Sequence, residues 1–127
     1  MEKTHFEQAK LWLEAAQHTA SSGETNNKYA VAIAMLIHAI IKANDALTSK
    51  FLSTTAKRHD DARRLFEDLI KRNLIKSEYS SYKQIIQEAI NNKARAEYRG
   101  SSFSKNDFER MERNTEKFIK MVEDTLK

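Results

Sequence analysis

The chain has 127 residues, of which 40% are hydrophobic, and this is the size of one ordinary domain with a single core. Its 22 basic and 18 acidic residues give a formal charge of +4, a mild excess that does not by itself indicate a nucleic-acid binder. The absence of cysteine excludes a disulfide framework, a thiolate nucleophile and a cysteine-ligated metal centre.

Helices are predicted along the whole chain, because two glycines and no proline leave little to interrupt them. The first predicted helix begins at Thr4, where Glu7 completes a Thr-x-x-Glu capping box, and ends at residues 21–23. Its inner face consists of apolar residues three or four positions apart, which are Phe6, Ala9, Leu13, Ala16 and Ala20.

The second predicted helix, residues 29–52, is apolar on nearly every face, so other helices must surround it. It also carries His38, Asn44 and Asp45 inside the apolar pattern. A buried carboxylate needs a partner or a shifted pKa, and we therefore expect Asp45 to be paired. The longest apolar stretch, residues 29–41, is shorter than the about 20 residues of a membrane span, and the amino-terminal segment lacks the layout of a secretory signal. These features predict a cytoplasmic protein without a membrane span.

Three further helices complete the predicted fold. The third begins around residues 59–61, the fourth covers 78–99 with Gly100 as its left-handed end, and the fifth runs from the cap residue Ser104 to Leu126. Asp107 lies three residues after Ser104 and completes a capping box. The sequence therefore predicts an all-α, five-helix up-and-down bundle that forms a single domain over residues 1–127.

Three short motifs occur in the order and spacing of a known family. They are Asp45-Ala46, then the His-Asp-Asp-Ala run at 59–62, then the Lys-x-x-Ala-x-Tyr pattern at 93–98. With them the sequence resembles the HEPN superfamily of small helical bundles over nearly its whole length. The resemblance implies a bundle that often dimerises, that occurs in toxin–antitoxin and defence systems or beside nucleotidyltransferases, and that in many members cleaves RNA.

The RNA-cleaving members use an arginine followed four to six residues later by a histidine, and this chain lacks that pair. Its histidines are His5, His18, His38 and His59, whereas its first arginine is Arg58. We therefore expect a non-catalytic HEPN-like module, dimeric, that binds a protein partner, with RNA or nucleotide as a further candidate ligand. The alternative is a divergent metal-independent ribonuclease that uses His59 and Asp45 with Arg58 or Arg95 of the partner protomer.

Two groups of polar residues are candidate sites. Asp45 and His59 could form an acid–base pair, or they could simply tie two helices together, which is the reading that we favour. Arg95, Tyr98 and Arg99 could bind phosphate or stack on a base, although basic residues at a helix end also complement its dipole. The sequence contains no glycine-rich phosphate loop and no metal-ligand spacing, so we expect no cofactor and no metal.

Overall fold

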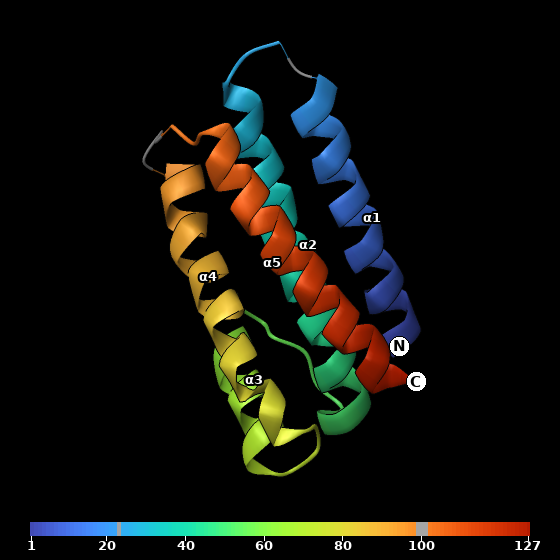
Figure 1. Ribbon diagram of the computed structural model, residues 1–127. Helices are drawn as coiled ribbons and strands as arrows, with labels where there is room; N and C mark the ends of the chain where they lie inside the picture. Colours follow the sequence, from blue (N-terminus) through green and yellow to red (C-terminus); the bar gives the residue numbers. More distant parts are fainter. Residues whose placement is uncertain (23, 99–101) are drawn as a thin grey trace.

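The computed structural model describes residues 1–22, 24–98 and 102–127, with the side chains of residues 97 and 98 left out. Within these ranges it consists of helices and the loops that join them (Figure 1). The elements are α1 (Glu2–Ser22), α2 (Asn27–Leu52), α3 (Asp61–Lys71), the short 3-10 helix η1 (Ser77–Tyr82), α4 (Lys83–Tyr98) and α5 (Lys105–Leu126). The predicted all-α bundle of five α-helices is therefore confirmed.

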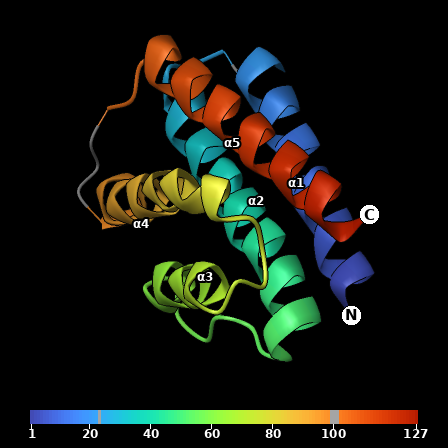
Figure 2. The same ribbon diagram turned by 60° about the horizontal axis from the view of Figure 1, so that its bottom comes forward.

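Helix α2 lies at the centre of the bundle, because α1, α3, α4 and α5 all pack against it. In Figure 2, α1 and α5 run along one side of α2, while α3 and α4 lie crosswise at its other side. The buried residues of α2 form most of one continuous apolar core; they are Ala32, Ile33, Leu36, Ile37, Ala39, Ile40, Ile41, Ala43, Ala46 and Leu47. This arrangement explains why the sequence of α2 is apolar on nearly every face.

Small residues allow α1 to approach α2 closely. Ala9 and Ala16 of α1 and Ala39 and Ala43 of α2 are completely buried. Among the described residues, α2 is the one helix long and apolar enough to cross a membrane, yet 67% of that segment is buried inside the bundle. Its apolar surface is thus already covered by the other helices, as expected for a core helix.

The connection between α2 and α3 returns along the bundle instead of forming a tight turn. Ser53 ends α2 in the left-handed conformation, with φ of 55°. The chain then runs back until the backbone N–H of Ala56 reaches Asp45, two turns before the end of α2. The first turn of α3 consequently lies beside the middle of α2, where Asn44 contacts it.

The predicted start of α5 was correct, and the predicted start of α1 was wrong. Ser104 and Asp107 form the predicted capping box, in which the N–H of Asp107 donates to Ser104 Oγ at 3.1 Å and the N–H of Ser104 donates to Asp107 Oδ2 at 2.8 Å. Helix α1 begins at Glu2 rather than Thr4, because the N–H of His5 already bonds to the carbonyl of Met1. The predicted terminator Gly23 and the predicted cap Gly100 lie outside the described residues.

Candidate functional site

Asp45 and Asn44 fasten the α2–α3 connection to the core. Asp45 is 5% exposed, and its Oδ1 accepts a hydrogen bond of 3.2 Å from the N–H of Ala56. Asn44 is completely buried, and its Nδ2 donates to the carbonyl of Ala62 at 3.0 Å. Two adjacent polar side chains of α2 therefore hold the loop and the beginning of α3 in place.

Burial governs the chemistry of Asp45. Loss of hydration raises the pKa of its carboxyl group above the ordinary value of 3.8, and the hydrogen bond from Ala56 and the charges of His5 and Lys42 oppose this rise. His5 belongs to α1, and Lys42 lies one turn before Asp45 in α2. Of these two charged neighbours, only His5 belongs to another helix, and the sequence did not connect that helix with Asp45.

His59 lies in a row of rings that crosses three parts of the fold. Its ring meets the ring of His38 edge to face, with centroids 5.7 Å apart and an interplanar angle of 82°. His38 in turn stacks on Trp12 of α1 at 4.8 Å and 25°. His38, which lies inside the apolar pattern of the second predicted helix, is only partly buried, and its ring contacts join α1 to the segment before α3. Within the described ranges, no cluster of acidic and histidine side chains could hold a metal ion.

Of the predicted basic patch, Arg95 is the residue whose side-chain contacts are known. Its guanidinium lies over the ring of Phe103 at 4.2 Å from the centroid, and Nη2 donates to the carbonyl of Ser102 at 3.1 Å. Phe103 is 4% exposed and anchors the segment before α5 in the core. The Tyr98 side chain and all of Arg99 lie outside the described residues.

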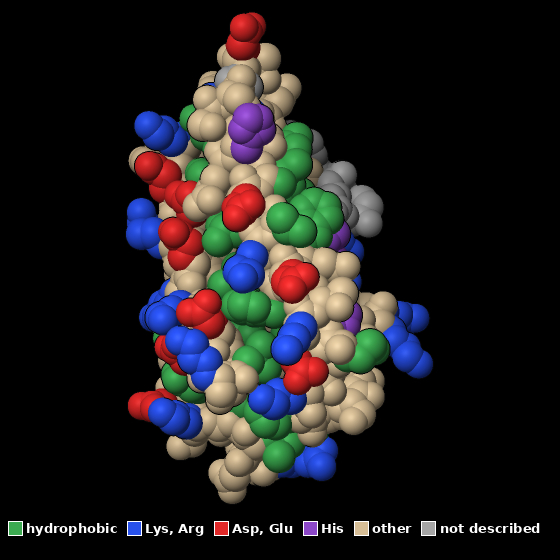
Figure 3. Space-filling model, turned by 90° about the vertical axis from the view of Figure 1, so that its right-hand side faces the viewer, with side chains coloured by type: hydrophobic (Ala, Val, Ile, Leu, Met, Phe, Trp, Pro, Cys, Tyr) green, Lys and Arg blue, Asp and Glu red, His purple; other side chains and the backbone are tan. Residues whose placement is uncertain are grey.

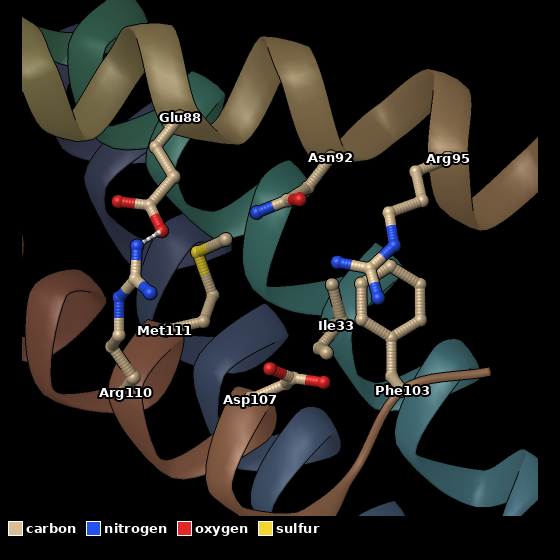
Figure 4. A pocket seen from close by; sticks show the side chains of 8 residues that line it. All are labelled: Ile33, Glu88, Asn92, Arg95, Phe103, Asp107, Arg110 and Met111. Atoms are coloured by element: carbon tan, nitrogen blue, oxygen red, sulfur yellow. Dashed lines mark hydrogen bonds and ion pairs between the residues drawn. The ribbon is translucent and has the colours of Figure 1, made fainter. Parts of the chain in front are cut away.

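A small polar cavity of about 90 Å³ lies beside Arg95, between α4 and α5. It is lined by Ile33, Glu88, Asn92, Arg95, Phe103, Asp107, Arg110 and Met111 (Figure 4). Figure 4 shows Asn92 and Arg95 projecting from α4, and Asp107 of α5 on the opposite side of the cavity, below Asn92. Across the cavity, Arg110 forms an ion pair with Glu88.

The cavity contains two guanidinium groups and two carboxylates, and its charged groups therefore balance. A hydrogen bond from the backbone of Ser104 lowers the pKa of Asp107, and the charges of Arg95 and Arg110 act in the same direction. Asp107 is consequently ionised at neutral pH. Sequence reasoning missed Asn92, Phe103 and Arg110 as members of a site. The available signal was the shared face of residues 88, 92 and 95 on the predicted fourth helix.

Among the described helices, two large apolar side chains are exposed, and one of them lies on the outer side of α1. Leu11 of α1 is 62% exposed and Val31 of α2 is 50% exposed, which is unusual for large apolar residues in this bundle. Next to Leu11 a shallow hollow is lined by Gln8, Trp12, Ala15 and Lys42. Figure 3 shows this side of the molecule, where hydrophobic side chains lie between scattered charges.

The structure is a helical module in which Asn44 and Asp45 hold the α2–α3 connection and a polar cavity lies between α4 and α5. Residues 3–125 match the HEPN domain, and this match covers nearly the whole chain. The chain therefore belongs to the HEPN family. No curated protein sequence matches it.

Proposed function

We propose that this HEPN chain is a non-catalytic, homodimeric module that binds RNA or nucleotide beside Arg95 and a protein partner elsewhere, in a toxin–antitoxin, defence or stress setting. Family membership supports the general role, and the missing arginine–histidine spacing supports a function without RNA cleavage. A nucleotidyltransferase is the first class of protein partner to test, and the genes next to this one would identify such a partner.

The observation that carries RNA binding is the fixed position of Arg95. One face of its guanidinium rests on Phe103, and a hydrogen bond to Ser102 holds its edge, yet the residue is exposed. An arginine has five N–H donors, so most remain for a ligand. A guanidinium that is already immobilised loses little conformational entropy when it binds a phosphate or stacks on a base.

Fluorescence anisotropy with short single-stranded RNAs tests this proposal. We expect binding that weakens as salt rises, because phosphate contacts release counterions. Arg95→Gln should weaken binding about tenfold, as expected for loss of one stacked or phosphate-bound arginine. Arg113→Gln is the matched control, since Arg113 is an exposed arginine of α5 that does not line the cavity. An absence of binding even at low salt contradicts the proposal.

The second candidate function is metal-independent RNA cleavage. The observation that favours it is the pair of rings formed by His38 and His59, because two neighbouring imidazoles can divide the roles of general acid and general base. In this mechanism the arginine would be Arg58 or Arg95 of the partner protomer, and Asp45 would be the acidic partner of His59.

Incubation of pure protein with structured RNA separates the two candidate functions. Cleavage that His59→Ala abolishes and His18→Ala leaves unchanged would establish the enzyme and end the non-catalytic proposal. His18 is the matched control because it is exposed on α1. Equal and absent cleavage by wild type and both variants would end the enzymatic candidate.

A further inference from the structure

The charges of the cavity between α4 and α5 restrict what can enter it. A phosphate group would approach the carboxylates of Asp107 and Glu88, and an isolated cation would approach the guanidinium groups of Arg95 and Arg110. Because positive and negative groups balance, the cavity favours a neutral ligand with both donors and acceptors. The lining offers both kinds of partner.

Arg95 adds a condition on the ligand's shape. Its guanidinium is planar, and Phe103 covers one face while the residue stays exposed at the mouth of the cavity. A flat ring can stack on the other face of the guanidinium, as bases do on arginine. A neutral, flat group that carries donors and acceptors along its edge is a nucleobase.

We propose that this cavity receives the Watson–Crick edge of a guanine base. The proposal rests on RNA or nucleotide binding beside Arg95 and specifies which base is read there. A carboxylate accepts two parallel hydrogen bonds, and the adjacent N1–H and N2–H of guanine supply them to Asp107. Adenine and cytosine present a single amino group, and uracil a single N–H, so none of them matches the carboxylate equally well.

The remaining groups of the cavity complete this recognition. Asp107 gives one acceptor position to the N–H of Ser104, and a carboxylate has about four such positions. The amide of Asn92 points into the cavity and can donate to the carbonyl oxygen of guanine (Figure 4). A volume of about 90 Å³ holds the edge of a base rather than a whole nucleotide, which leaves the sugar and phosphate outside.

The test uses four single-stranded RNAs that differ only in the central base and have uridine at all remaining positions. We expect the guanine RNA to bind about tenfold more tightly than the adenine, cytosine and uracil RNAs, since a good bidentate contact discriminates by at least this factor. Equal affinity for all four RNAs would overturn guanine recognition and leave RNA binding intact. No binding of any RNA at low salt would end both proposals.

Two variants locate the recognition in the cavity. Asp107→Asn keeps an oxygen for the N–H of Ser104 but offers guanine a donor where it needs an acceptor. The affinity for the guanine RNA should therefore fall to about the affinity for the other three RNAs. Asn92→Ala, which has no capping role, should weaken guanine binding about threefold to tenfold. Glu109→Gln removes the same charge from α5 outside the cavity and should leave the preference unchanged. A preference that survives both cavity variants contradicts the proposal.

Discussion

The carboxyl group of Asp45 accepts a hydrogen bond from a backbone N–H, whereas a buried acid is usually paired with a basic side chain. This contact connects the middle of α2 to Ala56, a residue of the returning loop. A buried carboxylate that remains ionised loses hydration, and one hydrogen bond only partly replaces it. We therefore expect Asp45 to contribute to stability through the oxygen that accepts the hydrogen bond and to oppose stability through its charge.

Substitutions of Asp45 separate these two contributions. Asp45→Ala leaves the N–H of Ala56 without its acceptor and should lower the free energy of unfolding by about 1–3 kcal/mol. Asp45→Asn retains a carbonyl oxygen and removes the charge, so at neutral pH it should be at least as stable as wild type. Urea and thermal melts measure both variants. An unchanged midpoint for Asp45→Ala would show that the loop contact has no energetic role.

The stability difference between wild type and Asp45→Asn should depend on pH, and its direction follows from the pKa of Asp45. Burial raises the pKa of Asp45 in the folded protein above its ordinary 3.8, so the neutral acid is the form that folding favours. Stability from this group is fully present below 3.8 and is lost as pH rises through the folded pKa. The advantage of Asp45→Asn over wild type should therefore grow across the mildly acidic range and then level off. A difference between the two proteins that stays constant with pH would contradict this.

Individual residues show where sequence reasoning stops. The apolar pattern around Asp45 predicted its burial, because a carboxylate between two buried faces of a helix has no route to water. Its partner could not be predicted, since Ala56 offers only a backbone group and its place depends on the path of the loop. Arg95 was recognisable as a candidate from the sequence. Its contact with Phe103 could not be predicted, because it depends on how the segments before and after residues 99–101 pack together. The predicted roles of His59, Tyr98 and Arg99 stay predictions.

At the scale of elements, caps decide where helices begin only when the residues before them cannot be helical. Ser104 is extended, with ψ of 169°, and the helix starts directly after it. Thr4 had no such role, because the preceding Glu2 suits a helix amino terminus and allows an earlier start. The fourth helix was predicted over residues 78–99, but its first part forms the separate 3-10 helix η1 (Ser77–Tyr82), and α4 begins at Lys83. The three serines and two tyrosines of η1 are weaker helix formers than the alanine, glutamine and lysine residues of α4.

The capping box of α5 also bears on the cavity, since Ser104 holds Asp107 in place. Ser104→Ala should lower the free energy of unfolding by about 1 kcal/mol, the usual cost of losing such a cap. Ser81→Ala, at an exposed position of η1, is the control and should change stability little. Chemical denaturation measures both. Equal stability of the two variants would show that the second half of the box, from Asp107 to the N–H of Ser104, suffices.

For the whole molecule, the central position of α2 follows from composition alone. A helix that is apolar on most faces must be covered on most faces, and α1, α3, α4 and α5 supply that cover. What composition does not determine is which outer face remains for a second molecule. The exposed Leu11 and the hollow beside Trp12 and Lys42 make the outer side of α1 the face that we assign to the proposed homodimer.

Leu11→Glu tests this assignment. Because Leu11 is 62% exposed, the change should alter the stability of the folded chain by no more than about 0.5 kcal/mol. Within a dimer, however, it would place a charge where an apolar side chain is covered, and the loss of about 1.5–3 kcal/mol should weaken association at least about tenfold. Sedimentation velocity across a range of concentrations measures this, with Gln84→Glu on α4 as the control for the added charge. A wild type that stays monomeric contradicts the homodimer, and a Leu11→Glu variant that dimerises as tightly as wild type places the interface on another face.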